Sequence, residues 1–272
     1  MSRVAVAVLQ FPGLNCETET LRELTRAGVQ ATLVRWNERS AHLARYAGFV
    51  IPGGFSYQDR IRAGAIAAKS PLLEEVVREV EKGKPILGIC NGAQILVEAG
   101  LVPGEEAGRI DLCLAPNKVK AWSGYHARWV FVKPESPSCF FTETLHEPFP
   151  IVVAHGEGRF YTEDQGMWNS LRERGRFVLR YCGAQGESAR GFPENPNGVA
   201  DDVAGMSGLD GQVLAFMPHP ERASLLWQLP EDLPGVWGER RRAAAGNKEE
   251  LQAEGPGRAL LAAFRRLEGG GT

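Results

Sequence analysis

One cysteine stands in a sequence context that favours chemistry. Cys90 follows the apolar residues 85–89 and lies between Gly88 and Gly92, in the stretch GICNGAQ. A strand that turns directly into a helix here would place the thiol at a helix N-terminus, where thiolates are favoured and free N–H groups stabilise an oxyanion. The small glycines allow strand, turn and helix to approach closely. The alternative is a buried structural cysteine.

A nucleophilic thiol needs a base, and His219 is the best placed of the five histidines. It follows the apolar residues 213–217 in the stretch MPHPE. Pro220 favours an extended backbone at His219, so His219 and Glu221 can project to the same side. The carboxylate would then hold the imidazole in one tautomer. The alternative is a loop histidine between two prolines that has no chemical role.

A glycine turn follows another predicted strand. Residues 52–56 read PGGFS, directly after the apolar residues 48–51. Its amides are candidates for a second oxyanion donor, although an ordinary glycine turn would have the same sequence. Open α/β sheets bind ligands at the carboxyl ends of their strands, so we expect this turn to meet Cys90 and His219 there.

Strands and helices alternate through the first hundred residues, which predicts parallel βαβ units and an α/β layer fold. The predicted strands cover residues 4–9, 30–35, 48–51 and 85–89, and the predicted helices run from about 17 to 28, 71 to 83 and 93 to 99. Further strands are expected at 129–133, 150–154, 177–182 and 213–217. We expect one domain over residues 1–272, with a polar excursion at about 228–255 and a last helix at 258–266.

Composition supports neither nucleic-acid binding nor membrane binding. The 272 residues carry 31 Lys+Arg and 33 Asp+Glu, a formal net charge of −2. The chain therefore has no excess of positive charge that would attract a polyanion. The five cysteines are scattered without a Cys-x-x-Cys pair, which argues against a disulfide framework and a zinc site. No apolar run approaches the roughly 20 residues of a membrane span. We therefore expect a cytoplasmic protein without a bound metal.

These stretches resemble the class I (triad-type) glutamine amidotransferases. GICNGAQ resembles their nucleophile elbow, and His219 with Glu221 resembles their His–Glu pair. Within that family the resemblance is greatest to the glutaminase subunits of phosphoribosylformylglycinamidine synthase, an enzyme complex of purine biosynthesis. The stretches that carry it lie in the family's order at residues 12–16, 52–57, 62–67, 154–160, 195–198 and 217–222.

The resemblance implies a fold and a mechanism. The fold is a single flavodoxin-like three-layer α/β domain, with a mostly parallel central sheet and an added antiparallel portion. Cys90 attacks the side-chain carboxamide of L-glutamine, and the amides of Gly54 and Asn91 stabilise the oxyanion. His219, oriented by Glu221, protonates the departing ammonia and then activates the water that hydrolyses the γ-glutamyl thioester.

The resemblance also implies partners. Gln94 contacts the bound glutamine, and the ammonia passes to a separate synthetase subunit that uses ATP and Mg. A small bridging subunit is a further partner that the resemblance allows, and no cofactor is assigned to this chain. The sequence contains no G-x-x-x-x-G-K phosphate loop, in agreement with ATP being handled elsewhere.

Four features depart from the family pattern. Ala93 stands where a bulky aromatic residue is expected, and Gln58 where glycine is expected. Residues 115–128 match only loosely, and residues 228–255 are longer than usual. We interpret Ala93 as enlarging the space beside the glutamine pocket.

Two other functions remain open on sequence alone. The same triad could supply ammonia to a different acceptor. A non-catalytic binding or regulatory protein could also use this scaffold, with a reactive cysteine as a sensor, because fold alone does not specify function. His219 and Glu221 are the discriminating residues, since a sensor does not need them.

Overall fold

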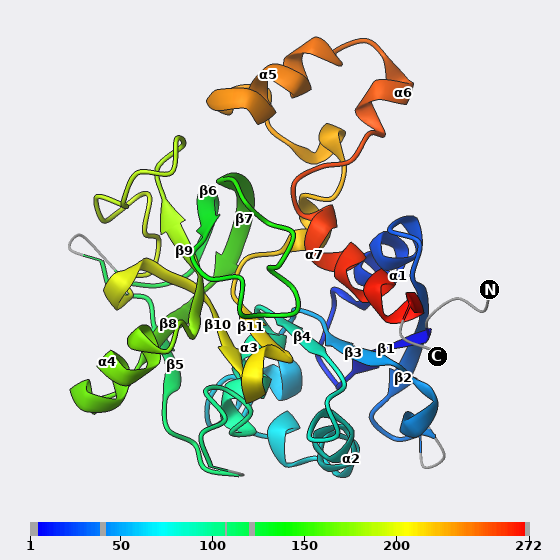
Figure 1. Ribbon diagram of the computed structural model, residues 1–272, viewed down its shortest axis with the longest axis vertical. Coiled ribbons are helices and arrows are strands. Elements are labelled where there is room, and N and C mark those ends of the chain that lie inside the picture. Colours follow the sequence, from blue (N-terminus) through cyan, green and yellow to red (C-terminus); the bar gives the residue numbers. More distant parts are fainter. Residues whose placement is uncertain (1–4, 39–41, 107, 120–122, 270–272) are drawn as a thin grey trace.

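The chain folds around a large twisted sheet with helices on both sides (Figure 1). The computed structural model describes residues 5–38, 42–106, 108–119 and 123–269. Val4, the first residue of the predicted strand 4–9, lies outside the described residues, as do positions 120–122 within the loosely matching segment.

The first hundred residues contain the predicted alternation. The elements are β1 (Ala5–Gln10), α1 (Glu17–Arg26), β2 (Gln30–Arg35), β3 (Gly48–Ile51), α2 (Pro71–Val80), β4 (Ile86–Ile89) and α3 (Asn91–Glu98). Helix α2 begins as its sequence predicts: Ser70 accepts a hydrogen bond from the Leu73 amide, and Pro71 occupies the first helical position. Strands β3 and β4 are buried at every residue, as their unbroken apolar runs indicate.

The remainder contains more regular structure than the sequence predicts. Its elements are β5 (Cys113–Pro116), β6 (His126–Pro134), β7 (Phe149–His155), β8 (Glu157–Tyr161), α4 (Gln165–Glu173), β9 (Phe177–Cys182), β10 (Val203–Gly208), β11 (Val213–Phe216), α5 (Gly235–Ala243), α6 (Lys248–Leu251) and α7 (Arg258–Ala262). The elements not predicted are β5, β8, β10, α4, α5 and α6. Strand β10 reads VAGMSG. The sequence did not predict it because glycine has a low strand propensity.

The main sheet combines a parallel and an antiparallel half. Its strand order is β2-β1-β3-β4-β11-β10-β9-β6-β7, and β5 pairs with β8 in a second small sheet. The pairings from β2 to β11 are parallel, and those from β11 to β7 are antiparallel. The α/β fold class is therefore confirmed, with the antiparallel portion extending one edge of the parallel strands.

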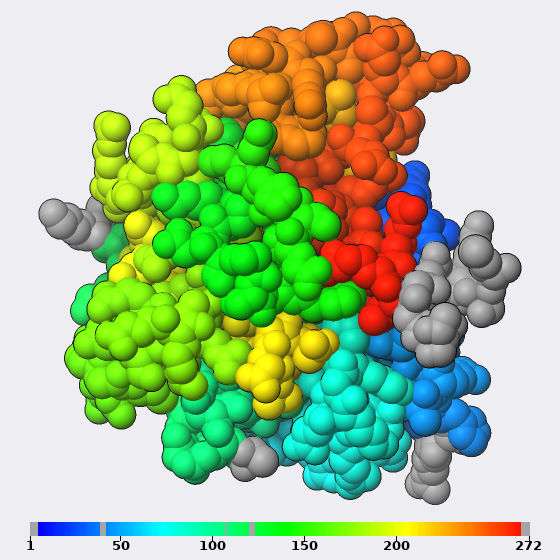
Figure 2. All heavy atoms as spheres, in the orientation of Figure 1, coloured from blue at the N-terminus to red at the C-terminus, as the bar shows by residue number. Residues whose placement is uncertain are grey.

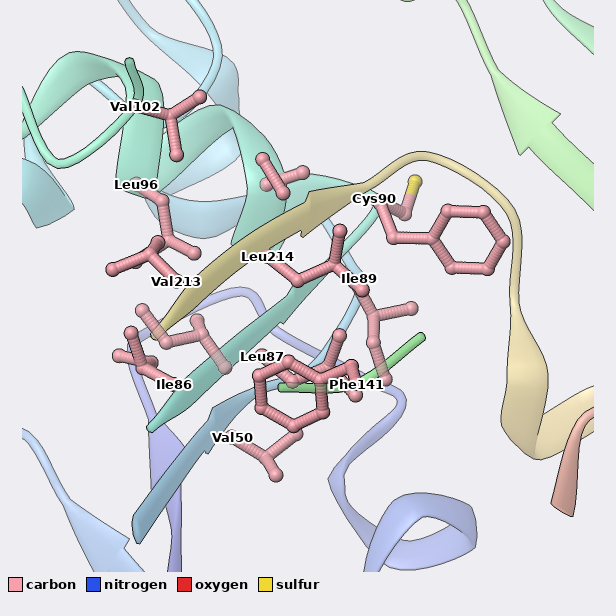
Figure 3. Packing of buried hydrophobic residues seen from close by; sticks show 14 of the residues in the cluster. Val50, Ile86, Leu87, Ile89, Cys90, Leu96, Val102, Phe141, Val213 and Leu214 are labelled. Atoms are coloured by element: carbon pink, nitrogen blue, oxygen red, sulfur yellow. The ribbon is translucent and has the colours of Figure 1, made fainter. Parts of the chain in front are cut away.

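The pairing of β4 with β11 positions the chemistry. The two strands run parallel with Ile89 opposite Phe216, so they end at the same level. The Cys90 amide continues the ladder by donating to the Phe216 carbonyl at 2.9 Å. Figure 3 shows Cys90 immediately beyond Ile89, with its sulfur at the margin of the apolar cluster. The segment that follows β11 carries His219, so the two residues are brought to one edge.

Apolar side chains cover both faces of these central strands. Leu96 and Val102 lie on the α3 side of β4 and β11, and Phe141 lies on the other side (Figure 3). The Phe141 ring packs edge-on against Phe264, with ring centroids 5.2 Å apart. The C-terminal segment after α7 thereby closes the core opposite α3.

The segment 228–255 projects from one end of the molecule (Figures 1 and 2). It contains α5 and α6. A small apolar cluster at its base consists of Leu226, Leu229, Leu233 and Ala244, and Trp129 and Phe131 of β6 pack against this cluster. The chain leaves and returns at one place, because the Leu226 amide donates to the Ala253 carbonyl at 3.0 Å. The predicted excursion thus contains helices that its polar composition did not indicate.

No helix in the described ranges is both long enough and apolar enough to cross a membrane.

The elbow should not tolerate a side chain at Gly92. A Cβ there would lie 2.0 Å from the Ile51 carbonyl oxygen, a backbone atom that cannot move aside. We expect Gly92→Ala to lower the free energy of unfolding by about 3 kcal/mol, measured by urea denaturation. Gly156→Ala is the control, since its Cβ would meet nothing closer than 3.9 Å. Equal stability of the two variants would contradict the tight elbow.

Candidate active site

Cys90 occupies a strained turn between β4 and α3. Its backbone has φ 52° and ψ −107°, a combination that L-residues avoid and that is typical of functional positions. Gly88 and Gly92 make the turn feasible: a Cβ on Gly88 would lie 2.6 Å from the Gly92 carbonyl oxygen. The Cys90 Sγ lies 3.5 Å from the Ala154 carbonyl oxygen. The predicted elbow is present.

His219 and Glu221 form a buried hydrogen-bonded pair. His219 Nδ1 lies 2.5 Å from Glu221 Oε1, and both side chains are almost fully buried. The His219 backbone is extended (φ −103°, ψ 94°), and its amide donates to the Val152 carbonyl at 2.9 Å. Burial by itself lowers the pKa of His219, but the Glu221 carboxylate together with the sulfurs of Cys90 and Cys16 outweighs burial, so the pKa is raised well above its usual value. The two side chains project to one side, as their spacing predicts.

The glycine turn after β3 lies against both residues. A Cβ on Gly53 would stand 2.7 Å from His219 Cε1 and 3.4 Å from Cys90 Cβ, so only glycine fits between them. Gly54 has φ +145°, and a Cβ there would lie 2.6 Å from Leu14 Cα. Within the described residues the Gly54 N–H donates no hydrogen bond to the backbone. It is therefore an available donor beside the thiol.

Asn91 and Gln94 form a hydrogen-bond relay along the first turn of α3. Asn91 Nδ2 donates to Gln94 Oε1 at 2.7 Å, and Gln94 Nε2 donates to the Glu157 carbonyl at 2.6 Å. Asn91 Oδ1 accepts from the Ser56 amide at 3.0 Å. The relay ties α3 to the glycine turn on one side and to β8 on the other.

A cavity of about 230 Å³ opens beside Cys90. Its lining includes Gly54, Gln94 and residues 154–156, so it is formed by the glycine turn, the elbow and the end of β7. Asp59 and Glu157 also line it. Glu157 lies in the stretch 154–160 that carries the family resemblance, but no role was predicted for either residue. The size suits a small amino-acid substrate rather than a nucleotide.

A second cysteine lies at this site. Cys16, for which the sequence predicted no role, accepts a hydrogen bond at its Sγ from Arg222 Nη2 at 3.1 Å. Its sulfur and one ligand atom each of His219 and Glu221 lie within 4.8 Å of one another. The Asn15 and Cys16 amides donate to the Gly53 carbonyl and hold the glycine turn. Cys16 lies in the stretch 12–16 that carries the family resemblance, but its position along the sequence does not predict a role for its thiol.

His155 is a buried neutral histidine in the cavity wall. Asn117 Nδ2 donates to the Gly124 and His155 carbonyls, so its Oδ1 can only accept, and it does so from the Gly158 amide and His155 Nδ1. His155 Nδ1 therefore carries the proton, and Nε2 is an acceptor. Burial, with the charges of His219 and His126, lowers the pKa of His155 to about 3.

The structure explains why the family pattern has glycine at position 58. Gln58 has φ +62°, between Tyr57 (φ +52°) and Asp59 (φ +53°), and glycine is the residue that adopts this conformation without strain. Ala93 is fully buried and is not among the residues that line the cavity. It does not enlarge the pocket, contrary to our interpretation of the sequence.

The neutral state of His155 should make stability sensitive to acid. Between about pH 6.5 and pH 3 the unfolded chain binds a proton at this residue and the native chain does not, so stability falls as the pH falls through that window. His155→Gln should reduce the slope of unfolding free energy against pH by about 1.4 kcal/mol per pH unit, measured by urea denaturation at pH 6, 5 and 4. The exposed His42→Gln is the control, and an unchanged slope in His155→Gln would contradict the neutral assignment.

Three comparisons relate this geometry to known proteins. Residues 3–246 match the family model of the CobB/CobQ-like glutamine amidotransferase domain. The phosphoribosylformylglycinamidine synthase subunit PurQ of Methanothrix thermoacetophila is 43% identical over 242 residues, which are 86% of this chain and 92% of the relative. The subunit of the same name from Pyrococcus furiosus is 41% identical over 232 residues, 84% of this chain and 93% of the relative.

A solved structure agrees with these relatives. The structure of PurLQS from Thermotoga maritima matches with a TM-score of 0.68 and 26% identity, covering 98% of this chain and all of the matched chain. The family match and the long matches at above 40% identity agree with the elbow, the His–Glu pair and the cavity beside them. The chain belongs to the CobB/CobQ-like glutamine amidotransferases and, among them, to the PurQ family of phosphoribosylformylglycinamidine synthase subunits.

Proposed function

We propose that this PurQ family member is the glutaminase subunit of phosphoribosylformylglycinamidine synthase and that Cys90, His219 and Glu221 are its catalytic residues. It hydrolyses L-glutamine to glutamate and ammonia for purine biosynthesis. The observation that carries the proposal is the 2.5 Å contact between His219 Nδ1 and Glu221 Oε1 at the strand end beside the Cys90 elbow. A base held by a carboxylate, next to a thiol at a helix N-terminus, is the arrangement that acyl transfer requires.

The first half of the reaction forms a thioester. The Cys90 thiolate attacks the carboxamide carbon of glutamine, and the amides of Gly54 and Asn91 donate to the resulting oxyanion. When the tetrahedral intermediate collapses, the C–N bond breaks and His219 gives its proton to the departing nitrogen, which leaves as ammonia. The γ-glutamyl group remains on the sulfur, and Gln94 contacts it from the cavity wall.

The second half releases glutamate. His219, now neutral, takes a proton from a water molecule that attacks the thioester carbonyl. The same two amides stabilise the second oxyanion, and Cys90 leaves as a thiolate. Glu221 keeps Nδ1 protonated throughout, so that Nε2 handles the moving proton.

Ammonia then passes to the synthetase subunit of the complex, the principal partner of this chain. We assign ATP and Mg to that subunit and no cofactor to this one, and a small bridging subunit completes the proposed assembly. The proposal also places the protein in the cytoplasm, since all five cysteines are unpaired in the structure.

Replacing the nucleophile should abolish the reaction. We expect Cys90→Ala, assayed with the synthetase subunit, to release no glutamate above background and to resist labelling by a glutamine-analogue electrophile. Glu221→Gln should lower kcat by at least about a hundredfold, since it removes the carboxylate that orients His219. Cys113→Ser, which replaces a half-buried thiol of β5, is the control and should retain activity.

Three outcomes would decide against the proposal. Glutaminase activity in Cys90→Ala would show that Cys90 is not the nucleophile. Full activity in Glu221→Gln, with labelling of Cys90 intact, would favour the thiol-sensor function. If the protein hydrolyses glutamine but does not complement a purine auxotroph, its ammonia is used by a different acceptor.

We further propose that residues 1–272 form one domain, with residues 228–255 as an excursion from it. The paired ends of the excursion support this division, and its small apolar cluster packs against Trp129 and Phe131 of β6. Replacing residues 230–251 with a short glycine-containing turn should leave the circular dichroism of the sheet and the glutaminase kcat/KM within about twofold of the parent. Loss of cooperative unfolding in the deletion variant would show that the segment is part of the core.

A further inference from the structure

Arg222 is the residue directly after Glu221 and has no part in the proposed chemistry. Its side chain turns back towards the site: Nε lies 3.7 Å from Glu221 Oε1, and Nη2 lies 3.1 Å from Cys16 Sγ. Nη2 is also 3.7 Å from Glu19 Oε1. Cys16 directly precedes α1, and Glu19 lies in its first turn. Arg222 therefore connects the carboxylate of the proposed triad to the N-terminal end of α1.

The Glu221 carboxylate has few other contacts. It is fully buried, and its Oε2 has no hydrogen-bond partner among the described residues. Oε1 accepts from His219 Nδ1, and in the described ranges only His219 and Arg222 lie within ion-pair distance of the carboxylate. A buried carboxylate is costly unless opposite charge or hydrogen bonds compensate it. The Arg222 guanidinium is thus the permanent positive charge that compensates Glu221.

The sulfur of Cys16 fixes this guanidinium. Within the part of the chain that the structure describes, it is the only atom that accepts a hydrogen bond from the Arg222 side chain. The sulfur is itself held in place: Cys16 is 1% exposed, its amide donates to the Gly53 carbonyl at 3.2 Å, and its thiol donates to Asn15 Oδ1 at 3.3 Å. With the thiol proton on the Asn15 side, the sulfur lone pairs remain for Arg222.

The same sulfur lies close to the imidazole. A Cβ on Gly53 would stand 2.7 Å from His219 Cε1 and 3.3 Å from Cys16 Sγ, so the ring and the sulfur flank one backbone position. Neither Cys16 nor Arg222 is among the residues that line the cavity beside Cys90. Sulfur, guanidinium, carboxylate and imidazole therefore form one cluster, of which the proposed mechanism uses only the last two.

We propose that Arg222 and Cys16 are positioning residues of the glutaminase. The Cys16 sulfur fixes the guanidinium, and the guanidinium holds Glu221 ionised and oriented for its hydrogen bond to His219 Nδ1. When His219 takes up a proton during the reaction, the fixed carboxylate stabilises the resulting imidazolium without having to reorient first. Neither residue touches glutamine, so both act through Glu221. The inference rests on the proposed function and deepens it.

The test measures glutaminase activity in the assembled synthase. We expect Arg222→Ala to lower kcat about tenfold or more and to leave KM for L-glutamine within about twofold, because it removes a contact that acts on the transition state and not on bound substrate. Added guanidinium ion, far below denaturing concentrations, should restore part of the lost kcat, since the Arg222 side chain is 39% exposed and solvent reaches its place. Arg172→Ala is the control, because that side chain is 44% exposed and ion-paired with Asp201, and it should keep full activity.

A double-mutant cycle tests the role of Cys16. Cys16→Ala should lower kcat about threefold or more through the loss of a hydrogen bond to a charged group, whereas Cys16→Ser keeps an acceptor and should retain more activity. Because Cys16 acts through Arg222, adding Cys16→Ala to Arg222→Ala should cause no further loss. Cys182→Ala removes an equally buried thiol from β9 and is the control for the cavity that the substitution leaves.

Full activity in Arg222→Ala, a rise in KM in place of the fall in kcat, or no response to guanidinium would each overturn the inference. Independent losses in the double variant would overturn the route from Cys16 through Arg222. Should Arg222→Ala fail to fold by circular dichroism, Arg222→Lys decides, because lysine keeps the charge but cannot make both contacts and should lower kcat about threefold. An unchanged kcat there would contradict the inference.

None of these outcomes bears on the nucleophile. Cys90→Ala tests the proposed function separately, since it should abolish hydrolysis altogether. An inactive Cys90→Ala together with a fully active Arg222→Ala would leave the proposed function standing and reject only the positioning role.

Discussion

The parallel pairing of β4 with β11 is the contact on which the site depends. These strands are far apart in sequence but end at the same level, with Ile89 opposite Phe216. One end turns into α3 at Cys90, and the other leads to His219. Any shift of register would separate the thiol from the imidazole by the 3.3 Å or so that each strand residue spans. The fully buried apolar runs of both strands fix that register, because a slip would break the packing on both faces.

Close packing of glycine backbone completes the arrangement. Gly88 and Gly92 let α3 approach β3 and β4, and Gly53 leaves room for His219 and Cys16 beside the elbow. These approaches also leave unpaired the N–H groups that we propose as oxyanion donors, since the Gly54 amide and the first amides of α3 have no backbone acceptor of the usual kind. The strain at Cys90 is held by the surrounding core, in which β3 and β4 are buried throughout.

Two buried histidines at the site illustrate how neighbours decide protonation. His219 and His155 are both removed from water, which by itself favours the neutral ring. Glu221, with the sulfurs of Cys90 and Cys16, reverses this for His219 and raises its pKa, whereas Asn117 offers His155 only a neutral acceptor and the pKa of His155 falls to about 3. One ring is therefore suited to exchange a proton, and the other to accept a hydrogen bond without ever becoming a cation.

The sequence by itself determined the α/β class, the boundaries of β2, β3 and β9, and the motifs around Cys90 and His219. These depend on local features: unbroken apolar runs, glycines flanking a cysteine, and a proline that extends the backbone at the histidine. Strand β10 and the helices of the 228–255 segment were not predicted, because glycine-rich or polar runs carry no clear period. Helix α4 was missed although its buried residues Trp168 and Leu171 recur at helical spacing.

Only the tertiary structure decided which polar residues meet. Cys16, Asp59, His155 and Glu157 come from four separate segments, and nothing in their spacing relates them to Cys90. Their contacts arise from the sheet order, which no local pattern specifies. Proximity also shifts the pKa values of Asp59 and His155, since burial and neighbouring groups act through space rather than along the chain.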